Sequence, residues 1–120
     1  MKRLLIIINS IGYGGAERAL VNILSQKSLY HDIEVHVLLL DDEPIVRELP
    51  KNVNLIIANS KRSLFLSILN VYRHVKSIKP NLCVSFLVRA NVCNAIVGKL
   101  VQNYPTVICE RMHLSSHFDN

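Results

Sequence analysis

The sequence predicts an α/β domain built on a doubly wound parallel sheet of about five strands, with helices on both faces. Short apolar runs alternate along the chain with segments of helical periodicity. Most of these runs are apolar on both sides, which is typical of parallel strands covered by helices on both faces. The chain has 120 residues, half of them hydrophobic, so residues 1–120 are expected to form a single domain.

The periodicity gives the order of the elements. Strands are predicted where apolar runs end at turn residues, over 3–9, 33–40, 53–58, 82–87 and 106–109. Apolar residues at helical spacing predict helices over 16–27, 61–79 and 91–101, and a short helix over 44–49. In the strand order 3-2-1-4-5, the first and fourth strands are neighbours at the switch point. Rossmann-like sheets bind their ligands there, outside the carboxyl ends of the strands.

The turn after the first predicted strand is rich in glycine. Gly12, Gly14 and Gly15 lead from the apolar run directly into the first predicted helix. Glycine lets a backbone come close to a ligand, and the free N–H groups at a helix start favour an anion. The turn therefore predicts a site for a phosphate or a diphosphate.

Two other interpretations of this turn stay open. The spacing of Gly12 and Gly14 fits the start of a dinucleotide-binding fingerprint, and Asp41 or Asp42 after the second strand could bind a ribose. Glu17 stands where that fingerprint has its third small residue. The turn could also be structural and bind no ligand.

Three segments, in order along the chain, carry a resemblance to a known family. They are residues 14–20 (GGAERAL), 84–91 (VSFLVRAN) and 107–111 (VICER). The chain thereby resembles the group 1 glycosyltransferases, which are retaining enzymes with two Rossmann-like domains in the GT-B arrangement. The second segment resembles their bacterial members that build polysaccharides and lipid-linked oligosaccharides.

The resemblance implies that this chain is the N-terminal, acceptor-side half of a glycosyltransferase. Such an enzyme moves a sugar from a nucleotide-sugar to a glycan or lipid-linked acceptor in cell-surface polysaccharide or oligosaccharide synthesis. The family's C-terminal donor-binding domain carries a paired-glutamate motif that has no counterpart here, so the 120-residue chain is expected to be inactive alone. A partner domain or an oligomer is expected to complete it. The alternatives are a stand-alone nucleotide- or dinucleotide-binding Rossmann module and a non-catalytic truncated relative.

The candidate site residues follow from the turn and from the resemblance, and no catalytic residue is identified. The donor diphosphate or substrate is expected to contact Gly12, Gly14, Gly15 and Arg89. The Arg89 guanidinium suits phosphate oxygens, although a surface salt bridge is an equal alternative. The resemblance adds four residues that line the site: Glu17, Asn91, Glu110 and Arg111. Asn91 could instead cap the helix that is expected to start there.

Charge is distributed unevenly along the chain. Residues 1–48 carry a net charge of −2 and residues 49–120 a net charge of +7. The predicted helix over 61–79 has no acid and six basic residues: Lys61, Arg62, Arg73, His74, Lys76 and Lys79. A basic amphipathic helix predicts a peripheral contact with the inner face of a membrane, while an ordinary solvated helix face is the alternative.

Other functional classes have little support in the sequence. His113 and His117 have the spacing of metal ligands but no third ligand, so neither a metal nor another cofactor is expected. The chain is basic, but its basic residues are not interleaved with aromatic residues as in many nucleic-acid-binding proteins, so no nucleic-acid partner is expected. Three cysteines without a CxxC spacing indicate reduced core thiols, and no apolar run reaches the length of a membrane span. A cytoplasmic protein is therefore expected.

Overall fold

A computed structural model describes residues 2–12, 14–26, 32–45, 48–101 and 105–109 of the chain. The strands are β1 (Lys2–Ile8), β2 (Ile33–Leu39), β3 (Asn54–Ile57), β4 (Leu82–Phe86) and β5 (Thr106–Cys109). The helices are α1 (Gly15–Leu24), α2 (Leu64–Ile78) and α3 (Val88–Val101). The predicted alternation of strands and helices is confirmed.

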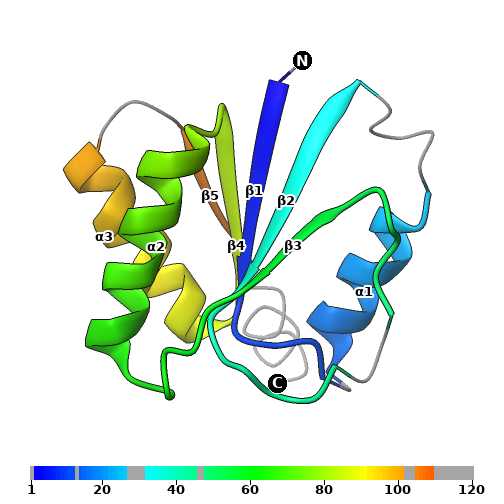
Figure 1. Cartoon of the computed structure of the whole chain (residues 1–120), viewed down its shortest axis with the longest axis horizontal. Helices are drawn as coiled ribbons and strands as arrows, with labels where there is room; N and C mark the ends of the chain where they lie inside the picture. Colours follow the sequence, from blue (N-terminus) through cyan, green and yellow to red (C-terminus); the bar gives the residue numbers. More distant parts are fainter. Residues whose placement is uncertain (1, 13, 27–31, 46–47, 102–104, 110–120) are drawn as a thin grey trace, which may run out of the picture.

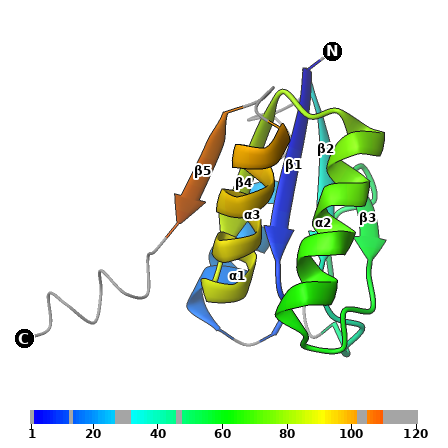
Figure 2. The same cartoon turned by 90° about the vertical axis from the view of Figure 1, so that its left-hand side faces the viewer.

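The five strands form one parallel sheet in the order β3-β2-β1-β4-β5, as the sequence predicts (Figures 1 and 2). The central strand is β1, in which Ile6 pairs with Val37 of β2 and with Val84 of β4. The chain moves outward from β1 through β2 and β3, and then returns to the other side of β1 with β4. The switch point of the sheet therefore lies between β1 and β4.

Helices cover both faces of the sheet, with α1 on one face and α2 and α3 side by side on the other (Figures 1 and 2). Successive side chains of β1 enter different cores: Leu5 and Ile7 pack with α2 and α3, and Ile6 and Ile8 pack with α1. All four are nearly or fully buried. Burial of such a side chain contributes about 1.5–3 kcal/mol, which explains why this strand is apolar on both sides.

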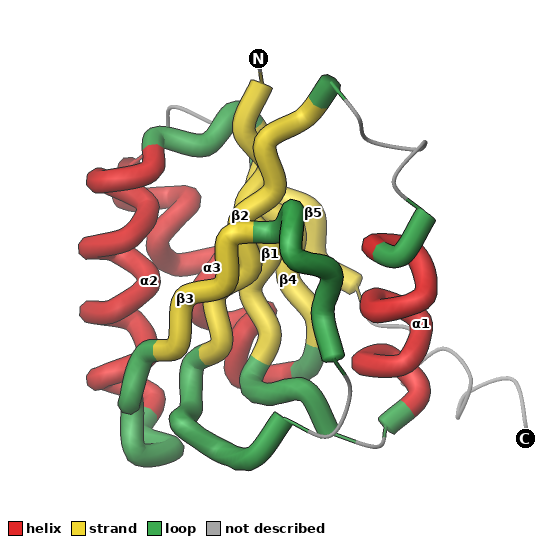
Figure 3. The backbone as a smooth tube through the Cα atoms, turned by 45° about the vertical axis from the view of Figure 1, so that its right-hand side comes forward, coloured by secondary structure: helices red, strands yellow, loops and turns green. Residues whose placement is uncertain are grey.

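The connection from β2 to β3 differs from the prediction. The described residues of the expected short helix, 44–45 and 48–49, form a loop that runs over the α1 face (Figure 3). Residues 46–47 lie outside the described ranges. Leu49 packs against the core on the α1 side, so this loop takes the place that a helix would occupy.

The two helices on the other face start at residues that the sequence did not indicate. Helix α2 begins at Leu64 instead of residue 61, because Lys61 and Arg62 have φ values of 51° and 58°. A right-handed helix cannot contain such residues. Ser63 caps α2 by accepting a hydrogen bond of 3.3 Å from the Leu66 N–H. Helix α3 begins at Val88 instead of residue 91, directly after Leu87, whose φ is 75°.

No helix within the described ranges has the length and apolar character that a membrane crossing requires.

Candidate functional site

The predicted site residues that the structure describes lie at the carboxyl edge of the sheet, where the loops after β1, β2 and β3 gather (Figure 3). Residues 9–14 follow β1, and Arg89 lies in the first turn of α3, which follows β4. Helix α1 follows β1 and helix α3 follows β4. Because β1 and β4 are adjacent and parallel, the N-termini of both helices lie at the switch point. Glu110 and Arg111 come after β5 and lie outside the described residues, as do His113 and His117.

The glycine turn accommodates a side chain of the chain itself. No described glycine has a positive φ, and Gly14 precedes α1 with φ −66° and ψ 165°, a conformation open to any residue. A Cβ atom added to Gly14 would lie 2.5 Å from Glu17 Oε1, and one added to Gly12 would lie 3.2 Å from Glu17 Oε2. The missing side chains at these two positions therefore make room for the Glu17 carboxylate.

Glu17 is a buried acid in the first turn of α1. Its exposed fraction is 8%, and its Oε1 atom is buried without a hydrogen-bond partner among the described residues. The positive end of the helix dipole favours a carboxylate at this position. A buried oxygen without a partner is costly, and such groups are rare in native structures.

Arg89 forms an ion pair that crosses the end of the central strand. Its Nη2 group donates to Oδ2 of Asp41, and only 16% and 7% of the two side chains are exposed. Asp41 follows β2 and Arg89 follows β4, so the pair passes the carboxyl end of β1, which lies between them. The Nη1 group of Arg89 is buried and has no described partner.

Asp41 has a second partner in the loop before α2. Its Oδ1 atom accepts a hydrogen bond of 3.2 Å from the Arg62 N–H, and its own N–H donates to the Asn9 carbonyl at 3.0 Å. The Arg62 guanidinium also binds Glu43, with 2.8 Å between Nε and Oε2. The sequence suggests Asp41 only as a possible ribose-binding acid. In the structure it connects the loop after β1, its own loop after β2 and the loop before α2.

Asn91 holds α3 to the sheet. It lies in the first turn of α3, so the interpretation that it caps this helix is wrong. Its Oδ1 atom accepts a hydrogen bond of 2.8 Å from Ser85 Oγ of β4, and Ser85 Oγ also lies 3.0 Å from Asn94 Nδ2. Ser85 and Asn94 are not among the predicted site residues, because a small polar residue within an apolar run does not by itself indicate a contact of this kind.

The basic surface near α2 is divided between a loop and a helix. Lys61 and Arg62 belong to the preceding loop, while Arg73, His74 and Lys76 are on α2 and Lys79 caps its end. Burial and the neighbouring Arg73 charge lower the pKa of His74. Large apolar side chains that remain exposed on α2 are Leu64, Phe65, Leu69 and Tyr72.

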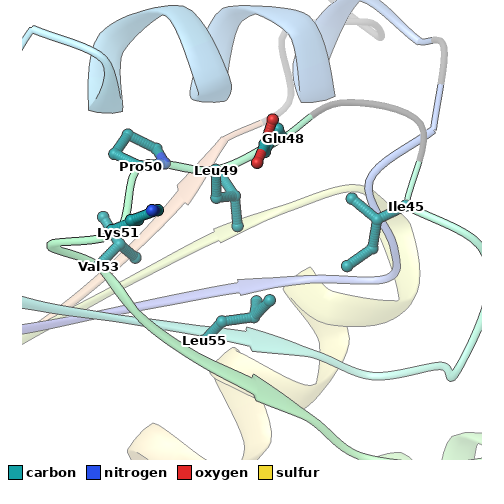
Figure 4. A pocket seen from close by; sticks show the side chains of 7 residues that line it. All are labelled: Ile45, Glu48, Leu49, Pro50, Lys51, Val53 and Leu55. Atoms are coloured by element: carbon teal, nitrogen blue, oxygen red, sulfur yellow. The ribbon is translucent and has the colours of Figure 1, made fainter.

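A pocket of about 620 Å³ lies away from these residues, between the β2–β3 loop and β3 (Figure 4). Its lining is mostly apolar and consists of Ile45, Glu48, Leu49, Pro50, Lys51, Val53 and Leu55. The pocket forms where a loop replaces a helix over the α1 face of the sheet. None of its lining residues belongs to the glycine turn or to the start of α3.

The described ranges hold no cluster of three or more residues that could bind a metal ion. Cys83 and Cys93 are buried free thiols, and burial raises their pKa values to about 12 and about 11. They are therefore poor nucleophiles and poor metal ligands at neutral pH. Comparison of the chain with protein-family models and with curated proteins finds no match.

Proposed function

We propose that this chain is the acceptor-binding half of a glycosyltransferase. The reaction would transfer a sugar from a nucleotide-sugar to a glycan or lipid-linked acceptor in cell-surface polysaccharide or oligosaccharide synthesis. The observation that carries the proposal is the position of the three segments with family resemblance. Residues 14–20 follow β1 at the start of α1, residues 84–91 run from β4 into α3, and residues 107–109 belong to β5, so their described parts lie on or directly after neighbouring strands of one parallel sheet.

The chemistry of this edge suits a reaction in which a nucleoside diphosphate departs. Positive charge and backbone N–H groups that face the leaving phosphates stabilise the transition state. The first turn of α3 offers such N–H groups, and Arg89 within it offers a guanidinium with one unpartnered amino group among the described residues. In the family that the sequence resembles, a second domain holds most of the donor and completes the site.

A peripheral contact with an anionic membrane agrees with this role. The exposed apolar residues of α2 and the basic residues on and beside it would face the lipid headgroups. Co-sedimentation with vesicles of phosphatidylglycerol and phosphatidylcholine tests the contact. We expect the chain to bind only to the anionic vesicles, and we expect salt to weaken the binding. Phe65→Ser should also weaken it, because Phe65 is the most exposed large apolar side chain of α2.

Titration with nucleotide-sugars and with NAD, followed by amide chemical shifts, tests the proposed function. UDP-glucose and other nucleotide-sugars at millimolar concentration should shift the amides of residues 9–18 and 88–90. Tight NAD binding without a response to nucleotide-sugars would instead indicate a dinucleotide-binding module. For that alternative, Asp41 would have to exchange its Arg89 partner for a ribose. An absence of binding to either ligand class would favour a relative without catalytic function.

A further inference from the structure

We propose that the glycine turn recognises hydroxyl groups through Glu17, and that the anionic group of the same ligand binds beside it, at Arg89 and the start of α3. The inference rests on the proposed function and makes it more specific. It assigns the sugar to the end of β1 and the phosphates to the end of β4.

The first argument is the state of the Glu17 carboxylate. It is more than nine-tenths buried, and its Oε1 atom has no hydrogen-bond partner among the described residues. A carboxylate can only accept hydrogen bonds, so it needs a donor. A ligand hydroxyl supplies one without adding a charge to the buried site.

The second argument is the geometry of the turn. Glu17 extends over Gly12 and Gly14 into the space that side chains at these positions would fill. A phosphate in the same space would meet a negative charge at short range in a poorly solvated place, which is unfavourable. A cation there would face the positive end of the α1 dipole. A neutral hydroxyl is repelled by neither.

The third argument is the distribution of unsatisfied groups. Four buried side-chain atoms of the described residues lack a hydrogen-bond partner, and three of them belong to this edge: Asn9 Oδ1, Glu17 Oε1 and Arg89 Nη1. The first two are acceptors, and the third is a cationic donor. A phosphate alone would satisfy only Arg89. A ligand with both sugar hydroxyls and a phosphate would satisfy all three.

The test compares UDP-glucose with UDP, which lacks the sugar, by ligand-observed NMR on the full 120-residue chain. Glu17→Ala should weaken UDP-glucose binding about tenfold or more, because it removes hydrogen bonds to a charged acceptor. UDP binding should stay the same or become tighter. Glu48→Ala, which removes an exposed acid outside this edge, is the matched control and should change neither affinity.

A second variant keeps the carboxylate but moves it. The backbone at Gly14 suits alanine, so Gly14→Ala should act mainly by pushing Glu17 out of the turn. We expect the same loss of preference for UDP-glucose over UDP. Glu17→Gln, which keeps the size of the side chain, should give an intermediate effect. Circular dichroism establishes that each variant is folded before its binding is compared.

The outcomes separate this inference from the proposed function. An equal loss of UDP and UDP-glucose binding in Glu17→Ala would overturn the inference, since Glu17 would then only support the helix start. Glu17-dependent binding of methyl glucoside, without binding of UDP or UDP-glucose, would overturn the part of the inference that places a phosphate of the same ligand at Arg89, and it would leave the acceptor-binding role of the proposed function standing. Failure of the unaltered chain to bind any of the three probes would overturn both.

Discussion

Asn94 links α3 to the edge strand β5 through a side-chain hydrogen bond. It lies on α3, is fully buried, and its Nδ2 atom lies 3.3 Å from the Cys83 carbonyl and 3.2 Å from the Val107 carbonyl. One amide thus joins α3 to both β4 and β5. Asn94→Ala should lower the free energy of unfolding by about 1–3 kcal/mol, because buried polar partners lose a hydrogen bond. Urea denaturation measures this loss, and the exposed Asn54→Ala should change stability by less than about 0.5 kcal/mol.

The buried thiols should be inert in the folded protein. With pKa values of about 12 and about 11, Cys83 and Cys93 carry almost no thiolate at pH 8, and the thiolate is the reactive form. Iodoacetamide should therefore leave both unmodified in the native state and modify both in denaturant. Peptide mapping by mass spectrometry gives the result for each thiol. Rapid native labelling of Cys83 would show that the core between α3 and β4 opens easily.

His74 should make the fold sensitive to mild acid. Burial lowers its folded-state pKa below the usual value of 6.5, so the unfolded chain binds this proton more readily. The contribution of neutral His74 is fully present above pH 6.5 and is lost as the pH falls from 6.5 through the lower folded-state pKa. We expect stability to decline between pH 7 and pH 5, and His74→Gln to flatten the decline. Thermal melts of both proteins across this interval measure the difference, and parallel curves would contradict the assignment.

At the scale of elements, two helical glycines should respond oppositely to the same substitution. Gly15 begins α1 and has open space where a Cβ would lie, so Gly15→Ala should stabilise by up to about 0.5–1 kcal/mol. A Cβ on Gly98 of α3 would lie 2.5 Å from Thr106 Cγ2 of β5. Overpacking costs about 1–3 kcal/mol and should outweigh the gain in helix propensity. Melting temperatures that rise for Gly15→Ala and fall for Gly98→Ala would agree with the packing of α3 on β5.

The sequence predicts these elements well where burial decides them and poorly where local backbone conformation does. The central strands β1 and β2 were found because their apolar runs are covered on both faces. The edge strands β3 and β5 keep large apolar side chains exposed and were found from short apolar runs bounded by turn residues. The starts of α2 and α3 were missed by three residues each. Lys61, Arg62 and Leu87 adopt left-handed conformations there, and these residue types give no warning of it. The hydrogen bond from the Arg62 N–H to Asp41, 21 positions away in the sequence, stabilises the turn before α2 and cannot be read from the local sequence.

At the scale of the whole molecule, the location of the candidate site could be predicted from the sequence. The side-chain contacts within the site could not. The observed strand order is the one that a doubly wound sheet implies, and it places the glycine turn and Arg89 after neighbouring strands. The pairing of Arg89 with Asp41, 48 positions apart in the sequence, depends on how the first turn of α3 and the loop after β2 direct these two side chains past the end of β1. The reach of Glu17 over the glycine turn likewise depends on side-chain direction, which spacing alone does not encode.

The Asp41–Arg89 pair links the two sides of the switch point, and its removal should have opposite effects on stability and on anion binding. Asp41→Asn leaves the largely buried Arg89 without its counter-charge, which should lower the free energy of unfolding by about 1–3 kcal/mol. The same change frees the guanidinium for phosphate oxygens, so UDP affinity should rise several-fold. Asp42→Asn, at the exposed neighbouring position, should do neither.

Urea denaturation and UDP titration of the unaltered chain, Asp41→Asn and Asp42→Asn measure the effects on stability and on UDP affinity. A gain in UDP affinity that Arg89→Met abolishes would assign the gain to the released guanidinium. A loss of UDP affinity together with stability in Asp41→Asn would mean that the ion pair positions Arg89 for its ligand. Asp41 would then hold Arg89 in position for the phosphate, and the ligand would bind with the Asp41–Arg89 ion pair intact.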